Sequence, residues 1–378
     1  MEPNKENILA LNLLRFFAAG LVFVDHYYSN LVASGYILPL LDSSLFRYLG
    51  FFGVATFFII SGFVISLSSE NKTTSEFIAS RFVRLFPVFW VCVSITVFIV
   101  IVFGHSSIDS ILSMRYVRNL TMLPQLLWNE PYIDNVYWTL QTELKFYFII
   151  IAFITLKIIQ KGRLEKIAFF TSLALLFDCF YHVSFFNNAL FAYCSDVVHL
   201  FFQNYFEGYL QYFVAGILLY GVYKNAKNYD NYIGIGICLF VATMKIVDVT
   251  IIVTLVQAFL FGVVILVSLK KINNQSFTWL GKSSQKVVIT LGAMTYPLYL
   301  LHNTISIVIL GSLKNSALPH YVVATLLVIF IGLLTLLVNT LDVDIRAFWR
   351  KFTTPTTADF DLGEIRNWFC GLTSGKRV

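Results

Sequence analysis

The stretch LRFFAAGLVFVDHYY, residues 14–28, carries three ionisable side chains, Arg15, Asp25 and His26, inside an otherwise apolar run. With its apolar flanks the run is long enough to cross a bilayer as a helix, which takes about 20 residues. A charge near the bilayer centre costs roughly 2.5–3.5 kcal/mol on the insertion scale, so such side chains are candidate functional groups. The stretch therefore predicts a membrane helix that carries part of a functional site.

The rest of the 378-residue chain has a similar composition, with 58% hydrophobic and only 13% charged residues. Soluble domains carry about 25% charged residues. Backbone amides in lipid must be paired internally, and the apolar runs are too long for barrel strands, so we expect an all-α, polytopic helical bundle. The chain has room for about ten transmembrane helices. The apolar windows are 8–33, 46–67, 86–103, 138–157, 165–186, 206–223, 231–247, 249–269, 287–310 and 320–341.

The basic residues predict an orientation, because cytoplasmic loops retain Lys and Arg. With a cytoplasmic N-terminus, most of the 27 Lys and Arg residues fall in alternate, cytoplasmic segments, so both termini are predicted to be cytoplasmic. The chain then divides into a transmembrane domain, 1–341, and a short cytoplasmic tail, 342–378. The first seven residues lack a cleavage pattern, so we expect the first apolar run to be retained.

Charge and cysteine content narrow the functional classes. Despite the net charge of +6, the position of the basic residues between apolar runs argues against a nucleic-acid partner. The five cysteines show no paired spacing, so we expect neither a disulfide framework nor a metal site.

Arg15 and His26 are predicted to share one face of the first helix. At about 1.5 Å and 100° per residue, their R-x10-H spacing gives about 16 Å of rise and about 20° of rotation. Simpler interpretations are that Arg15 extends to the cytoplasmic headgroups and that His26 only joins two helices. Asp25 could orient His26 or face an adjacent helix.

Two further segments place titratable groups inside predicted spans. In NVYWTLQTELKFYF, residues 135–148, Glu143 and Tyr147 share a helix face. In TYPLYLLH, residues 295–302, His302 follows Tyr299 by one turn. In the predicted topology His26, Glu143 and His302 all fall in the outer half of the membrane. We therefore expect the three to lie at similar depth.

Three other features are weaker signals. Arg81 and Arg84, one turn apart just before the third span, could hold phosphate, although ordinary positive-inside anchoring also predicts arginine there. In FFGVATFFIISGF, residues 51–63, the small residues Gly53, Ser61 and Gly62 suggest a close helix contact. The longest outer loop, 104–137, is of a length that is often functional.

Taken in order, these motifs resemble the acyltransferase-3 family of integral-membrane O-acyltransferases. The matching elements are Arg15 with His26, FFGVATFFIISGF, RFVRLFPVFW, WTLQTELKFY and TYPLYLLH. Ala55, Phe89 and Thr139 stand where the family often has Asp, Tyr and Ser. The chain looks like the stand-alone form, without a fused periplasmic esterase-like domain.

The resemblance implies transfer of an acyl group, usually acetyl from cytoplasmic acetyl-CoA, to a sugar hydroxyl of a surface polysaccharide, an exopolysaccharide or its lipid-linked precursor. It implies a multi-pass protein of the bacterial cytoplasmic (inner) membrane, with acyl-CoA, the glycan and membrane lipids as partners and no tightly bound cofactor. Such a site would hold the CoA head at the cytoplasmic mouth, with the chemistry some 15–20 Å deeper, roughly the separation of Arg15 and His26.

Residue roles carried by this interpretation are as follows. Arg15, Arg81 and Arg84 would bind the acyl-CoA donor. His26 would be the general base or an acyl-carrying nucleophile, with Glu143 or Asp25 orienting it. The residues expected to line the acceptor side are Trp138, Tyr147, Tyr299, His302 and Ser61. The alternative is a secondary transporter or lipid-linked sugar flippase with a buried His/Glu proton relay, but the chain shows no internal repeat.

Overall fold

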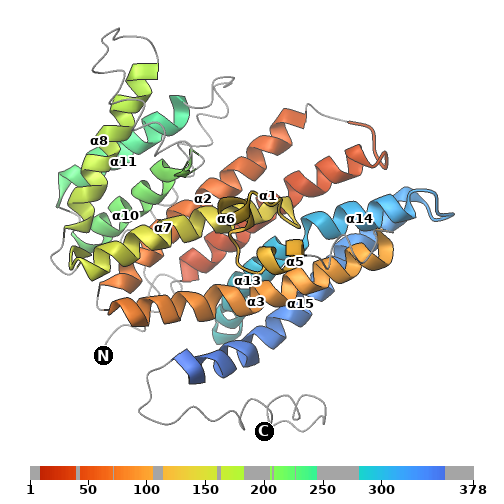
Figure 1. The fold of residues 1–378 in the computed structure, drawn as a ribbon. Helices are drawn as coiled ribbons and strands as arrows, with labels where there is room; N and C mark the ends of the chain where they lie inside the picture. The colour runs from red at the N-terminus through yellow and green to blue at the C-terminus, as the bar shows by residue number, and fades with distance from the viewer. Residues whose placement is uncertain are drawn as a thin grey trace.

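The computed structural model describes residues 9–39, 43–70, 72–104, 114–159, 163–182, 205–206, 208–225, 227–244 and 281–353. Within these ranges every regular element is a helix, and no strand occurs (Figure 1). The prediction of an all-α protein is therefore confirmed for the part of the chain described.

The helices follow the predicted apolar windows. They are α1 (Leu9–Ala33), α2 (Ser43–Ser69), α3 (Thr74–Phe103), α5 (Met114–Asn119), α6 (Pro124–Trp128), the 3-10 helix η1 (Asn135–Tyr137), α7 (Trp138–Thr155), α8 (Leu164–His182), α10 (Leu210–Lys224), α11 (Tyr229–Met244), α13 (Lys282–Leu301), α14 (Asn303–Leu313) and α15 (His320–Thr353). Every window contains a helix except 249–269, which lies outside the described residues.

Among the described residues, four helices, α1, α2, α3 and α15, are long and apolar enough to cross a membrane, and the bent pair α13 and α14 could form a fifth span. The expected total of about ten spans and the orientation of the bundle stay predictions. Helix α10 differs from a lipid-facing span, because its side chains from Leu210 to Val222 are all buried. It is an inner helix of the bundle.

Two boundaries differ most from the expected ones. Helix α3 begins at Thr74, well before the apolar window at 86, because Thr73 and Glu76 form a capping box. The Thr73 amide donates to Glu76 Oε2 at 2.8 Å, and the Glu76 amide donates to Thr73 Oγ1 at 3.3 Å. Arg81 and Arg84 therefore lie inside α3. Helix α15 continues past 341 to Thr353, into the segment assigned to the tail.

The helices pack as a bundle around α2. Helix α2 lies between α1 and α10, α1 also packs on α13, and α15 packs on α3 and α13. Figure 1 shows α8, α10 and α11 grouped on one side of α2, with α3, α13 and α15 on the other. This order brings the ends of α2, α3 and α15 to one face of the bundle.

Small residues on α2 allow this packing, as the sequence predicts. Gly62 lies against the carbonyl oxygen of Phe213, with the Cα of Gly216 3.1 Å from the position of a Cβ. On the other side, a Cβ at Gly53 would lie 2.6 Å from the carbonyl oxygen of Ala18. The expected close contact is confirmed, and it joins α2 to both α1 and α10.

We expect Gly62→Ala to destabilise the fold, by about 1–3 kcal/mol, because the added Cβ would overlap backbone atoms of α10 and force the helices apart. The measurement is the thermal unfolding midpoint of the detergent-solubilised protein. The matched control is Gly332→Ala on α15, where a Cβ meets no atom within 4 Å. An equal midpoint for the two variants would contradict the importance of this contact.

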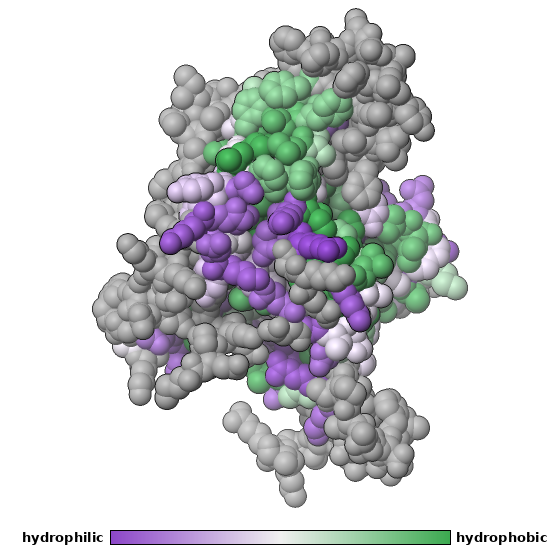
Figure 2. All heavy atoms as spheres, turned by 90° about the vertical axis from the view of Figure 1, so that its left-hand side faces the viewer, coloured by the Kyte–Doolittle hydropathy of each residue, from purple (hydrophilic) through white to green (hydrophobic). Residues whose placement is uncertain are grey.

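The surface separates polar from apolar side chains. Figure 2, which shows the left side of Figure 1, has hydrophilic residues gathered across the middle of that face, with hydrophobic residues above them and to their right. The outward face of α15 is apolar, with exposed side chains that include Tyr321, Leu326, Ile329, Leu333, Leu337 and Val343. Lipid would cover the α15 face.

Candidate active site

A cavity of about 780 Å³ lies where α1, α2, α3, α7, α13 and α15 meet. Its volume falls in the range of roughly 300–1,000 Å³ that is typical of small-molecule and cofactor sites. At one end it is lined by the basic residues near the ends of α3 and α15, and its walls include apolar side chains of α2 such as Val54, Phe57 and Phe58.

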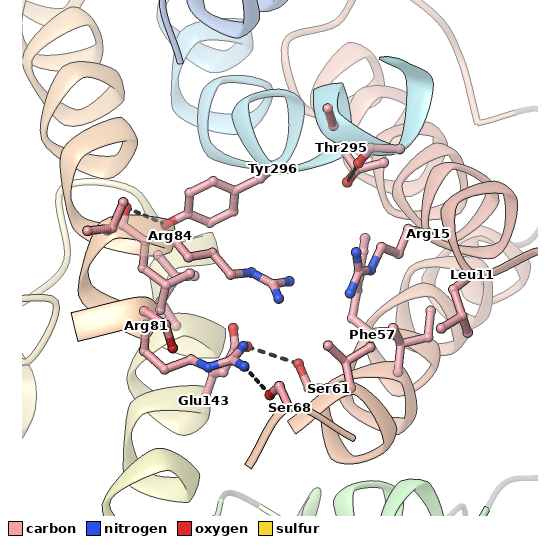
Figure 3. A pocket seen from close by; sticks show the side chains of 18 of the residues that line it. Leu11, Arg15, Phe57, Ser61, Ser68, Arg81, Arg84, Glu143, Thr295 and Tyr296 are labelled. Carbon is pink, nitrogen blue, oxygen red and sulfur yellow. Dashed lines mark hydrogen bonds between the residues drawn. The ribbon is translucent and has the colours of Figure 1, made fainter. Parts of the chain in front are cut away.

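The three arginines expected to bind the donor line this one cavity. In Figure 3, Arg15 and Arg84 extend toward each other from opposite walls. Among the described residues, neither side chain has a hydrogen-bond partner. Arg81 donates to the Ser68 hydroxyl, and its guanidinium lies 5.1 Å from the centre of the Phe77 ring. The cavity therefore contains two guanidinium groups that are available to an anionic ligand.

Further basic residues at the cavity come from outside the predicted set. Arg346 and Arg350 of α15 and Lys72, just before α3, also line it. Arg346 is bonded at 2.5 Å to Asp342, one turn earlier on α15. The sequence contains a signal for the two α15 arginines, because they follow the last apolar window at helical spacing. Hydropathy alone does not include them in the helix, because the apolar window ends at 341.

Glu143 belongs to the arginine end of the site. Its Oε1 accepts hydrogen bonds from Ser61 at 2.9 Å and from Tyr147 at 2.5 Å. The ring of Tyr147 lies 5.6 Å below the Arg81 guanidinium. The structure thus brings together three of the predicted site residues, Ser61, Glu143 and Tyr147. They lie beside the arginines and not beside the histidines. The structure does not pair Glu143 with His26.

His26 pairs instead with His302. Nδ1 of His26 lies 2.8 Å from Nε2 of His302, and the rings stack with centroids 5.0 Å apart. His302 is only 2% exposed and stands at the break between α13 and α14, whose axes differ by 54°. The apolar window 287–310 is therefore divided between two helices at this residue. Pro297, which lacks an amide hydrogen, lies inside α13 close to the break.

Asp25 faces an adjacent helix, which is one of the two alternatives considered for it. Its carboxylate lies against Gly50 of α2, at the position that a Cβ there would occupy. Neighbouring residues of a helix point about 100° apart. While His26 faces α13, Asp25 therefore faces α2.

Asp134 is a buried residue of the long segment 104–137, and the sequence alone assigns it no specific role. Its carboxylate accepts hydrogen bonds from Asn303 Nδ2 at 2.9 Å, from the Thr304 amide at 2.8 Å and from the Val136 amide at 3.1 Å. It thus caps the N-terminus of α14, directly after His302, from its position just before η1. No sequence pattern connects the two positions, because a helix cap is normally supplied by a neighbour in the chain.

Tyr299 lies between the cavity and the histidine pair. It lines the cavity, its hydroxyl lies 3.0 Å from Thr139 Oγ1, and its ring lies 5.7 Å from that of His302. Thr139 stands where the resemblance described above has Ser, and its own hydroxyl makes this contact with Tyr299. Trp138 packs against Tyr209, with the ring centroids 5.2 Å apart.

Continuity of α1 gives the site its length. Because Leu9–Ala33 is one helix, Arg15 and His26 lie on one side of it, about 16 Å apart along its axis. A molecule with an anionic head among the arginines would need an arm of that order to reach the histidines.

Comparison with known proteins gives an independent result. Residues 8–340 match a protein family described as an acyltransferase domain. Nodulation protein 10 of Rhizobium leguminosarum bv. viciae is 29% identical over 158 residues, which cover 36% of this chain and 41% of that protein. The chain thus matches less than half of that relative's length. No solved structure gives a significant match.

Proposed function

This chain belongs to the acyltransferase-3 family, and on that premise we propose that it is an O-acetyltransferase of the bacterial inner membrane. The donor is cytoplasmic acetyl-CoA. The acceptor is a sugar hydroxyl of a surface polysaccharide, an exopolysaccharide or a lipid-linked precursor of either.

The observation that carries the proposal is the arrangement of arginines and histidines along α1. Acyl-CoA has a phosphate-rich head and a long flexible arm that ends in a thioester. The head would bind Arg15, Arg81 and Arg84, with Arg346 and Arg350 also lining the cavity. The arm would follow the apolar wall of α2 toward Tyr299, so that the thioester approaches His26.

The acceptor hydroxyl then loses its proton to the His26 imidazole as its oxygen bonds to the thioester carbonyl carbon. The tetrahedral intermediate collapses with cleavage of the carbon–sulfur bond. The sulfur of CoA takes the proton from the imidazolium, which gives free CoA, the ester and neutral His26. In this scheme the imidazole is a general base and forms no covalent intermediate.

Glu143 has a different role in this scheme from the one expected. Its carboxylate fixes Ser61 and Tyr147 and offsets part of the arginine charge before the donor binds. Trp138, next to Thr139 at the start of α7, would offer an indole ring on which an acceptor sugar could stack.

The test uses membranes from cells with and without the gene, supplied with acetyl-CoA labelled in the acetyl group. We expect label in the glycan or lipid-linked glycan fraction only when the protein is present, and a mass difference of one acetyl group per modified sugar. Glycans of the same mass and label content in both preparations would refute the proposal.

A further inference from the structure

At the break after α13, the His302 side chain contacts two backbone carbonyl groups of that helix. Nδ1 of His302 lies 2.9 Å from the carbonyl oxygen of Tyr299 and 3.2 Å from that of Leu298. The Leu298 carbonyl also accepts the His302 backbone amide at 3.2 Å, whereas the later carbonyl groups of the last turn have no amide partner within the helix. A histidine at such a C-terminus can donate to them.

This contact determines where the proton of His302 resides. A carbonyl oxygen only accepts, so Nδ1 of His302 must carry the hydrogen. In a neutral imidazole the other nitrogen is then an acceptor. Nε2 of His302 therefore accepts, and Nδ1 of His26, 2.8 Å away, must be the donor.

We propose that His302 is a positioning residue that holds His26 in the tautomer with its proton on Nδ1, so that Nε2 of His26 is the basic atom. The tautomer follows from the contacts alone, whereas its role in catalysis rests on the proposed function. His302 then orients the catalytic base, whereas the sequence predicted that His302 lines the acceptor side.

The other protonation states are costly. If Nε2 of His302 carried the only proton, its Nδ1 lone pair would face two carbonyl oxygens. If both nitrogens were protonated, a cation would lie in a side chain that is 2% exposed, and among the described residues no carboxylate is hydrogen-bonded to it. The neutral tautomer with Nδ1–H satisfies every contact observed.

The arrangement also serves the reaction. When Nε2 of His26 takes the acceptor proton, Nδ1–H still donates to His302, so the imidazolium keeps its partner throughout. Asp134 maintains the geometry from the far side, because it binds Asn303 and Thr304 and so fixes the start of α14. His302 is held between that cap and the end of α13.

The kinetic test compares His302→Leu with His302→Gln. Leucine removes the acceptor for Nδ1–H of His26, whereas the glutamine side-chain oxygen can replace it. We expect kcat to fall about 10–100-fold in His302→Leu, as for other orienting partners, with KM for acetyl-CoA unchanged. His302→Gln should recover most of kcat. Equal loss in both variants, or full kcat in His302→Leu, would overturn the proposal.

A second measurement does not depend on activity. In the 15N spectrum of histidine-labelled protein in lipid, with the His26 signals assigned by their loss in His26→Gln, Nδ1 of His26 should be protonated and Nε2 not. His302→Leu should give a mixture of both tautomers. A wild-type His26 protonated on Nε2 would contradict the assignment. Wild-type protein that transfers no acetyl group would instead refute the proposed function, and the spectrum would still decide the tautomer.

Discussion

His26→Gln is expected to lower the rate of acetyl transfer about 10²–10⁴-fold, the usual contribution of a general acid–base group. Glutamine keeps a polar side chain of similar length but has no basic nitrogen to take the acceptor proton. KM for acetyl-CoA should change little, because His26 is not among the described residues that line the cavity. The measurement is kcat and KM with labelled acetyl-CoA and the purified protein in lipid vesicles that contain the acceptor glycan.

The matched control is His320→Gln at the start of α15. His320 is exposed and contacts the Tyr36 ring, with centroids 4.5 Å apart. This variant should keep the wild-type rate. A His26→Gln protein that inserts normally and transfers acetyl groups at full rate would remove His26 from the mechanism.

The same protein can separate the two roles considered for His26. Without acceptor, a general base leaves the label on acetyl-CoA, whereas an acyl-carrying nucleophile transfers it to the protein. We expect no protein-bound label in rapidly quenched wild-type samples. Label that appears on wild-type protein and disappears in His26→Gln would establish a covalent intermediate instead.

Arg84→Gln should raise the dissociation constant for acetyl-CoA roughly 10- to 150-fold. A hydrogen bond to a charged group contributes about 1.5–3 kcal/mol, and each 1.4 kcal/mol changes an equilibrium constant about tenfold. Arg84 suits this test because its guanidinium extends into the cavity without a hydrogen-bond partner among the described residues. Its removal would leave no described side chain without a hydrogen-bond partner that it has now.

Binding of acetyl-CoA to the solubilised protein can be measured by calorimetry, with Arg163→Gln as the control. Arg163 is exposed just before α8, away from the cavity, so its loss should leave affinity unchanged. Higher salt should weaken wild-type binding, because ions screen charge pairs near the open mouth. Equal affinity of the Arg84→Gln and Arg163→Gln proteins would exclude Arg84 from the donor site.

Local regularities made part of this site predictable. The face shared by Arg15 and His26 follows from helix geometry alone, and α1 is a continuous helix. The small residues of α2 indicated its close contacts correctly, because only glycine lets two helix backbones approach so closely. The three arginines proved to line one cavity.

Other features depend on which helices are neighbours, and hydropathy does not encode that. Glu143 was predicted to lie near His26 because both were expected at a similar depth in the membrane. In the structure, Glu143 accepts hydrogen bonds from Ser61 and Tyr147 at the arginine end of the site. The cap supplied by Asp134 to Thr304 joins segments separated by 170 positions. The start of α3 was placed late because hydropathy detects the apolar part of a helix, whereas the capping box marks its true beginning.

If the proposed function holds, the position of Tyr299 would have a consequence for the energy balance of the cell. Its ring packs edge-on against Phe57, with centroids 5.9 Å apart, and both residues line the cavity on the side of the histidine pair. An enzyme that takes its donor from one side of a membrane and its acceptor from the other could easily become a proton leak. Two aromatic rings at this junction would let the reactants meet while interrupting a continuous column of water, so the proton gradient would survive each turnover.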